Sequence, residues 1–466
     1  MRRNALIAYL LGSLSTAGLG QPLPSPIRIS APSNNAAAVP PTHIDRSGLI
    51  RAARATPVRR HVMNNGLRVL VNESPQEDIV ALELLIQVGA MEESTPLEGI
   101  GQVLQELLTQ RVRNGPQNND RIEDSAAQFQ VTPEMDYLRL SLVCTSEEYP
   151  ALLAAVADAL KKGPVTESEL EDVRKILIRN LDQGQGALGQ LYDIFRQSFY
   201  RYHPYKRTGR VAEGTIERLK PKALQDFLDK YLVANRMVLS ICGRVDRNEA
   251  VDKVQKLFAS LPQKELHRME VNWEAKSVEK EVFLTGGGQV GWLFVGFPAP
   301  PAPSRDYVGM RVINSVLGEG LSSRLFTEIR EKRSLCYELG SMYPVLRGPS
   351  HFLTYTVTKP EQVWPARKQL LSEIERLKKE GVSELELEEN KRKIIGAYWQ
   401  ERETNQGRAF HAALNELLGL GHEFDSQYMR LLDSVTTQDV KDVAQRYLDN
   451  ATLIVARPRG IFYWDL

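Results

Sequence analysis

The chain has 466 residues, a length that exceeds the usual size of one domain and predicts two or three. With 42% hydrophobic and 25% charged residues, its composition is that of a folded globular protein, which excludes a disordered or fibrous chain. The formal net charge of +1 gives no indication that nucleic acid or an acidic membrane surface is the partner.

The first residues have the pattern of a secretory signal peptide. Arg2 and Arg3 precede an apolar run over residues 5–14, and small residues follow up to Gly20. A membrane anchor is the alternative, but the run is shorter than the ~20 residues that a spanning helix needs, and no later segment is long and apolar enough. We therefore expect a signal peptide over residues 1–20 and an exported protein, either periplasmic or secreted.

Proline, serine, asparagine and alanine dominate the next stretch, which predicts a disordered tether over residues 21–58. We expect folded structure to begin near His61. Strands and helices then mix without strict alternation, so the predicted fold class is α+β. The periodicity of the first half predicts strands at 67–71, 80–88 and 237–242, and helices at 97–113, 148–162, 166–183, 190–201 and 224–232.

An internal repeat divides the folded part of the chain. The segment 165–175 resembles 382–392 at an offset of 217 residues, and the segment 227–232 resembles 443–448 at an offset of 216. Two marker pairs at nearly one offset predict a duplicated domain of ~200 residues, with chance similarity between helix-forming segments as the alternative. The predicted organisation is a first domain at 59–264, a linker at 265–280 and a second domain at 281–466.

The most specific motif lies between Gly318 and Tyr343, which we call the signature segment. Glycines and two serines suit the start of a helix, and apolar residues at helical spacing predict a helix from Leu321 to about Arg333. Arg330 and Tyr337 stand seven residues apart, near the expected change from helix to strand, and would share a face if the helix continued. A solvated, charged helix end is the alternative interpretation of this charge run.

The signature segment resembles the second-domain signature of the pitrilysin/insulinase metallopeptidases, a family that includes mitochondrial processing peptidase. The matching residues read SSRLFTEIREK from Ser322 to Lys332, followed by Tyr337. The resemblance extends from His61 to the C-terminus. It implies two homologous domains, each a mixed or antiparallel sheet covered by helices, that form a half-shell. It also implies that Arg330 and Tyr337 reach a zinc site in another domain and hold the scissile carbonyl of a bound peptide.

The zinc motif of this family is altered at every functional position. The family carries His-x-x-Glu-His on a first-domain helix, where this chain has Gln102 and Glu106 at the histidine positions and Gln105 at the general-base position. Asn180 stands where the family has its distal glutamate ligand. A neutral amide is a poor zinc ligand and a poor base, so we expect no metal in this chain.

Neither the remaining histidines nor the cysteines indicate another metal site. The seven histidines have no i,i+3 or i,i+4 spacing, and a site built from distant histidines stays an alternative that no pattern favours. His203 lies in a His-Pro-Tyr turn that also resembles the family, and we expect it to be structural. Cys144, Cys242 and Cys336 lack disulfide or zinc-ligand spacing, so buried single thiols are expected.

Three consecutive glycines, Gly286, Gly287 and Gly288, interrupt an expected strand region at the start of the second half. Glycine lets another backbone approach closely, as a clamped peptide substrate requires. A plain hairpin or bulge explains them equally well.

The resemblance therefore implies a chain that has lost the zinc half of an active site and kept the oxyanion half. We predict a non-zinc subunit of an exported heteromeric metallopeptidase, inactive alone, whose sister chain carries His-x-x-Glu-His and the zinc. Arg330 would orient the peptide carbonyl and Tyr337 would stabilise the tetrahedral intermediate. The alternatives are a non-catalytic peptide-binding or structural protein of the same fold, and a self-sufficient enzyme with its own metal.

Overall fold

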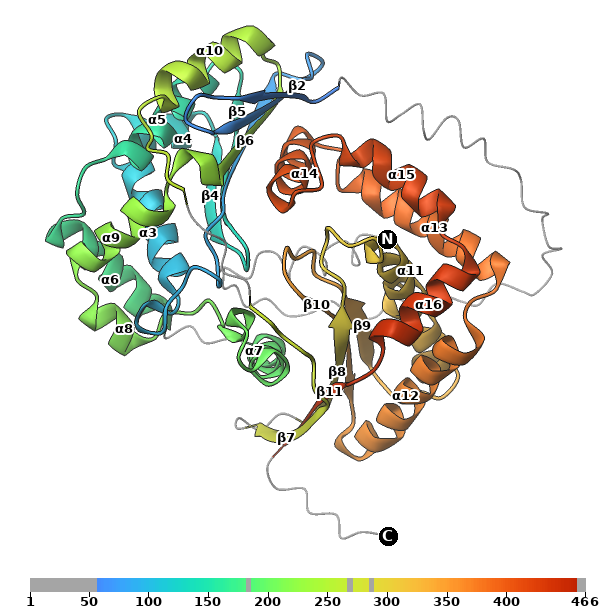
Figure 1. Ribbon diagram of the computed structural model, residues 1–466. Coiled ribbons are helices and arrows are strands. Elements are labelled where there is room, and N and C mark those ends of the chain that lie inside the picture. The colour runs from blue at the N-terminus through green and yellow to red at the C-terminus, as the bar shows by residue number, and fades with distance from the viewer. Residues whose placement is uncertain (1–56, 182–185, 266–270, 285–288, 459–466) are drawn as a thin grey trace. The chain divides into compact units, whose positions relative to one another are not determined.

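The computed structural model describes residues 57–181, 186–265, 271–284 and 289–458 (Figure 1). The predicted signal peptide, nearly all of the predicted tether and the glycines Gly286, Gly287 and Gly288 lie outside the described residues. The first element is β1 (Arg59–Val62), close to the predicted start of folded structure. Within the described ranges, no helix is both long and apolar enough to cross a membrane.

The first sheet has six strands in the order β1-β2-β6-β3-β5-β4. Strand β2 pairs in parallel with β6, and the other neighbouring strands pair antiparallel. The strands are β2 (Arg68–Glu73), β3 (Ile79–Ile86), β4 (Gln128–Pro133), β5 (Leu138–Thr145) and β6 (Met237–Gly243). The helices of this half are α3 (Ile100–Arg113), α4 (Asn118–Asp124), α5 (Tyr149–Lys161), α6 (Glu167–Leu181), α8 (Glu213–Arg218), α9 (Pro221–Tyr231) and α10 (Arg247–Phe258).

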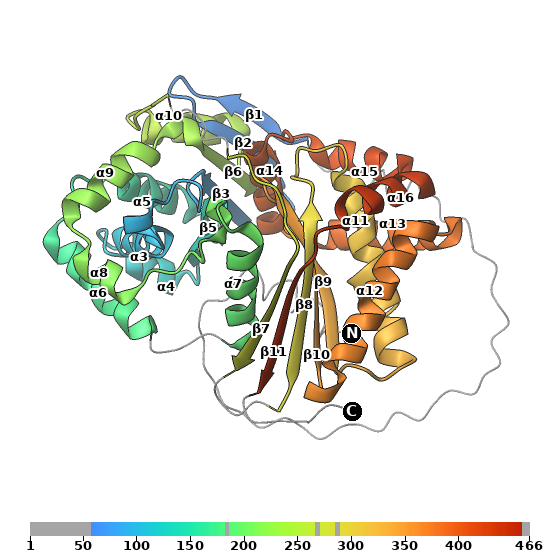
Figure 2. The same cartoon turned by 60° about the horizontal axis from the view of Figure 1, so that its bottom comes forward.

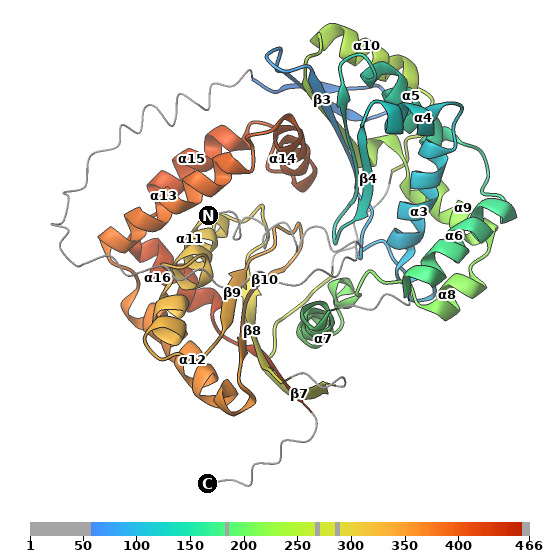
Figure 3. The ribbon, with the colours of Figure 1, turned by 180° about the vertical axis from the view of Figure 1, so that it is seen from behind.

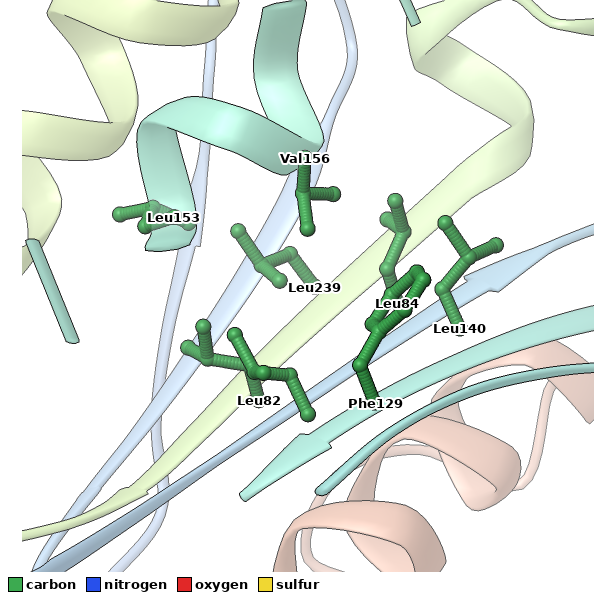
Figure 4. Close-up of a pocket in the computed structure, with 8 residues that line it drawn as sticks. Leu82, Leu84, Phe129, Leu140, Leu153, Val156 and Leu239 are labelled. Atoms are coloured by element: carbon green, nitrogen blue, oxygen red, sulfur yellow. The ribbon is translucent and has the colours of Figure 1, made fainter. Parts of the chain in front are cut away.

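Apolar side chains fill the space between this sheet and α5 (Figure 4). Because side chains alternate along a strand, Leu82 and Leu84 of β3 face this core while Leu85 faces the opposite side of the sheet. The enclosed space between them is about 10 Å³. That volume holds at most one water molecule, so it is no ligand site. Its lining consists of Leu82, Leu84, Phe129, Leu140, Leu142, Leu153, Val156 and Leu239.

The second sheet repeats this topology with five strands in the order β7-β11-β8-β10-β9. Strand β7 pairs in parallel with β11, as β2 does with β6, and the other neighbours are antiparallel. The strands are β7 (Val278–Leu284), β8 (Gly291–Ala299), β9 (Glu338–Met342), β10 (Ser350–Thr358) and β11 (Thr452–Pro458). Its core is shared with α11 (Tyr307–Gly318), α12 (Val363–Glu380), α13 (Glu384–Gln400), α15 (Phe424–Ser434) and α16 (Thr437–Tyr447).

The sequence repeat corresponds to equivalent helices in the two halves. The starts of α6 and α13 are 217 residues apart, and those of α9 and α16 are 216 apart. The predicted α+β class with two homologous domains is thus confirmed. Strand β7 begins at Val278, inside the predicted linker, because its pairing with β11 extends back to Thr452.

Each half also supplies one helix to the sheet of the other half (Figures 1 and 2). Helix α7 (Ala187–Tyr200) of the first half packs on β8 and β11, and α14 (Asn405–Leu418) of the second half packs on β2, β3 and β6. The two helices begin 218 residues apart, so they are equivalent in the repeat. Figure 3 shows the first sheet between its own helices, α3 and α5, and the exchanged helix α14.

The exchanged helices make close contacts with the sheets that they cover. A Cβ atom at Gly296 of β8 would lie 2.2 Å from the Phe195 ring of α7, so this glycine gives the helix its room. At the start of α14, the side-chain amide of Asn405 donates to the Ile79 carbonyl at 2.9 Å. A sheet that is buried on both faces needs apolar side chains packed against each face. In each half of this chain, the helix on one face of the sheet comes from the opposite half.

Candidate functional site

The signature segment forms a short π-helical turn instead of the predicted regular helix. Helical geometry begins at Arg324, and the turn η4 covers Phe326–Glu331, so the predicted helix Leu321–Arg333 is wrong at both ends. Left-handed backbone at Gly320, with φ of +82°, and at Ser334, with φ of +50°, limits the helix on each side. Turns of the π type are rare and occur frequently at functional sites.

Arg330 lies near the end of this turn with an exposed side chain. Its guanidinium carbon is 4.9 Å from the centre of the Phe326 ring, and it forms no ion pair within the described residues. The neighbouring cations differ, because Lys332 and Arg333 bind the Glu328 carboxylate at 2.6 and 2.7 Å and lower its pKa. The alternative of a solvated charge run therefore describes those two cations, while Arg330 keeps its donors available.

Tyr337 directly precedes β9, and 53% of its surface is exposed. Its backbone N–H donates to the Val357 carbonyl at 2.8 Å, which fixes the main chain against β10. Its hydroxyl has no hydrogen-bond partner in the part of the chain that the structure describes. Because the turn ends before Tyr337, this residue and Arg330 do not share a helix face. They flank one short connection, and both present unused donors to solvent.

The four altered zinc positions lie on two helices that pack together, α3 and α6. Gln102, Gln105 and Glu106 share one partly exposed side of α3, and Asn180 is exposed near the end of α6. The side-chain carbonyl of Gln102 accepts a hydrogen bond from the Val211 backbone N–H at 2.9 Å. This glutamine thus has a structural use, because it holds a connecting segment against the helix.

That segment crosses directly over the start of α3. A Cβ atom at Gly99 would lie 2.1 Å from the Val211 nitrogen, and Gly99 has a φ of +81°, so only glycine fits here. The buried Glu93 carboxylate accepts a hydrogen bond at 3.2 Å from the N–H of Gly99, the residue that precedes the helix. Burial raises the pKa of this carboxyl. Sequence reasoning missed both features, since the residues concerned are far apart in the chain or carry no family motif.

The donors at these positions do not fit a zinc ion. Two amides and one carboxylate on α3, with a third amide on α6, offer none of the imidazole nitrogens that the family's site uses. No group of three or more histidine, cysteine or acidic side chains in the described ranges is placed to hold a metal. These side chains therefore provide no basis for a catalytic step through zinc in this chain.

The buried histidines are structural. The His203 ring nitrogen accepts from the Tyr205 N–H at 3.2 Å, and burial lowers the pKa of His203 to about 4. His351 lies between two tyrosines of α7, with its ring nitrogens 3.1 Å from the Tyr192 hydroxyl and 2.8 Å from the Tyr200 hydroxyl. Burial lowers the pKa of His351 to about 3.

The three cysteines are buried and form no disulfide, as predicted; they are Cys144, Cys242 and Cys336.

A polar pocket of about 310 Å³ lies beside β4, one of the two outer strands of the first sheet. Within it, the Ser141 hydroxyl accepts from the Gln406 amide at 2.9 Å and donates to the buried Glu83 carboxylate at 2.7 Å. An outer strand has one row of backbone groups without strand partners, to which an extended peptide can pair. The lining residues are Arg113, Ala127, Gln128, Phe129, Gln130, Ser141 and Gln406.

Two family profiles match the chain. Residues 68–208 match the profile described as "Insulinase (Peptidase family M16)", and residues 218–394 match the one described as "Peptidase M16 inactive domain". The chain belongs to the M16 peptidase family. It is a member without the zinc motif, because Gln102, Gln105 and Glu106 replace the residues of that motif.

The M16 assignment agrees with the similarity to individual proteins. The chain is 22% identical to the "uncharacterized zinc protease YmxG" of Bacillus subtilis, over 86% of this chain and 99% of that protein. It is 24% identical to an "uncharacterized zinc protease" of Rickettsia bellii, over 86% of this chain and 97% of that protein.

Solved structures show the same M16 fold. A protease from Helicobacter pylori matches with a TM-score of 0.78 at 20% identity, over 86% of this chain and 99% of that one. A Pseudomonas fluorescens chain described as a peptidase M16 inactive domain matches with a TM-score of 0.79 at 20% identity, over 86% and 98% of the two chains. At this identity the structures establish the fold of this M16 chain and no more.

We expect the purified chain to bind no stoichiometric zinc. Gln102, Gln105, Glu106 and Asn180 do not provide three good ligands and a base, so nothing at these positions competes with water for the ion. Metal analysis after dialysis measures this. About one tightly bound zinc ion per chain would contradict the expectation and would indicate a self-sufficient enzyme.

Proposed function

We propose that this M16 chain is the non-zinc subunit of a heteromeric zinc metallopeptidase that hydrolyses peptides. The observation that carries the proposal is the pair Arg330 and Tyr337, whose side chains are exposed and whose donors have no hydrogen-bond or ionic partner among the described residues. These donors coexist with a zinc position that has lost its ligands. A chain with carbonyl-binding donors and no metal has a use in catalysis only beside a chain that holds the metal.

In this proposal the two residues act on the substrate carbonyl. A sister chain with His-x-x-Glu-His supplies the zinc ion, which activates water and polarises the scissile bond. The planar guanidinium of Arg330 directs two N–H groups at the carbonyl oxygens of the peptide. The Tyr337 hydroxyl donates a hydrogen bond to the oxygen that becomes negative in the tetrahedral intermediate. Both residues bind and orient, and neither transfers a proton.

A non-catalytic peptide-binding protein is the second candidate, and the pocket beside β4 favours it. The outer edge of β4 offers main-chain hydrogen bonds to an extended peptide, and the polar pocket gives room for its side chains. This function needs neither zinc nor a sister chain. The two candidates therefore differ in the subunits that the native protein contains as well as in its activity.

Purification of the native complex, with subunit identification and metal analysis, tests the proposal. We expect a co-purifying chain that carries His-x-x-Glu-His, one zinc ion per pair of chains, and peptide hydrolysis by the assembly alone. A neighbouring reading frame that encodes such a homologue would agree with this. A chain that is recovered alone and still binds extended peptides would favour the peptide-binding protein.

We also propose export to the periplasm or the cell exterior, because residues 1–20 have the charged, apolar and small-residue regions of a signal peptide. Mature protein from the native host is then expected to begin near Gln21. N-terminal sequencing of the purified protein measures this. Retention of Met1 on a cytoplasmic protein would refute export.

A further inference from the structure

The charge run of the signature segment is divided between paired and unpaired cations. Lys332 and Arg333 both bind Glu328, and the Arg333 guanidinium also donates to the Glu328 backbone carbonyl at 2.7 Å. Arg330 takes no part in this group. An ion pair with Glu328 would have engaged its N–H donors, so the pairing of its neighbours leaves Arg330 free to bind another molecule.

Arg330 is nevertheless supported, by the face of an aromatic ring. Its guanidinium carbon lies 4.9 Å from the centre of the Phe326 ring, within the range of a cation–π interaction. Such an interaction uses the charge of the guanidinium, and no carbonyl or carboxylate among the described residues accepts a hydrogen bond from its N–H groups. A free arginine has large rotamer freedom, and a ring beneath it reduces that freedom without taking a donor.

The backbone that carries Phe326 is itself firmly held. Leu325 and Ile329, which flank Phe326 in the sequence, are fully buried in the core of the second half. Arg324 binds the Glu386 carboxylate of α13 through two N–H groups at 2.7 and 2.6 Å. Phe326 and Arg330, four residues apart, both lie in the π-helical turn η4. The ring and the guanidinium are therefore carried by one short, anchored element.

We propose that Phe326 is a positioning residue, which holds the Arg330 guanidinium ready to bind a peptide carbonyl. This inference rests on the proposed function, because the carbonyl belongs to the substrate of the assembled peptidase. Phe326 itself touches no substrate. Its contribution is to reduce the motion of Arg330 before the substrate binds. Loss of the ring should therefore affect only the steps in which Arg330 contacts the substrate.

The test uses the assembled complex and three variants of this chain. Phe326→Leu keeps an apolar side chain and removes the ring, Phe326→Tyr keeps the ring, and Arg330→Ala removes the cation. We expect Phe326→Leu to lower kcat/KM by about 2- to 30-fold, the range that corresponds to a cation–π interaction. Phe326→Tyr should keep the activity of the unchanged protein. In the Arg330→Ala background, Phe326→Leu should lower kcat/KM no further.

A matched control comes from another pair of an arginine and an aromatic ring in the same half. Trp364 of α12 lies under the Arg367 guanidinium at 5.4 Å, so Trp364→Leu removes a comparable ring away from the signature segment. We expect this variant to keep full activity. A second measurement needs no sister chain: in arginine-labelled protein, the ring-current shift of the Arg330 side-chain resonances should disappear in Phe326→Leu.

The outcomes separate the two proposals. If Arg330→Ala lowers activity and Phe326→Leu does not, the positioning role is wrong and the proposed function stands. If Arg330→Ala keeps full activity, the proposed function itself fails. An unchanged Arg330 spectrum in Phe326→Leu would overturn the positioning role whatever the activity.

Discussion

Replacing Tyr337 with phenylalanine is expected to lower kcat of the assembled peptidase by roughly 10²–10³, the loss typical of a single oxyanion donor. The variant keeps the ring and loses only the hydroxyl, and the Val357 carbonyl still fixes the backbone at this position. Folding and assembly should therefore survive. KM should change little, because the negative charge on the oxygen develops mainly in the transition state. Steady-state kinetics of the reconstituted complex measures both constants.

A matched control for this variant is Tyr202→Phe, which also removes the hydroxyl of an exposed tyrosine but lies in the first half. It should keep full activity. Arg330→Lys should lower turnover as well, because an ammonium group lacks the planar fork of a guanidinium. Full turnover by Tyr337→Phe would mean that the signature segment has no catalytic role here, and would leave the peptide-binding protein as the better interpretation.

The second large effect is expected for Gly99→Ala at the start of α3. A left-handed backbone costs a non-glycine residue about 1–2 kcal/mol, and the close approach of the Val211 backbone adds about 1–3 kcal/mol. We therefore expect the free energy of unfolding to fall by about 2–5 kcal/mol. Urea unfolding followed by circular dichroism measures this change.

Gly396→Ala is the matched control. Gly396 lies inside α13, and a Cβ atom there meets no other atom within 4 Å. Alanine is more favourable than glycine inside a helix. The free energy of unfolding of this variant should therefore exceed that of the unchanged protein by about 0.5–1 kcal/mol. Equal stability of the two variants would mean that the segment at Val211 does not press on the helix as described.

The parts of this structure that local sequence patterns determine could be predicted well. The apolar run of β3 and the amphipathic helix α3 were located to within a few residues, because the run of β3 is short and ends near Gly89, whereas α3 has apolar residues at helical spacing. The repeat predicted the paired sheets, since equivalent segments at one offset fold alike. Strands β4 and β5 were not identified, although the alternating polar and apolar residues of both are the pattern of a half-buried strand.

The details of the candidate site depended on contacts between distant residues. The π-helical form of η4 follows from anchors such as Arg324 to Glu386, 62 residues away, which a local pattern does not contain. The hydrogen bond between Gln102 and Val211 joins residues 109 positions apart. The sequence predicts that Gln102 is a poor zinc ligand, and the structure shows the hydrogen bond that the residue makes instead.

The exchange of α7 and α14 has a consequence for how the chain folds during synthesis. The last strand of the first sheet ends at Gly243, whereas the helix that covers its second face begins only at Asn405. Until then Leu70, Leu85 and Val238 have no cover from α14, so a growing chain carries an open apolar surface that invites aggregation or chaperone binding. The half that is synthesised first can therefore complete its fold only after α14 has been made. Folding of the first half thus requires nearly the whole chain.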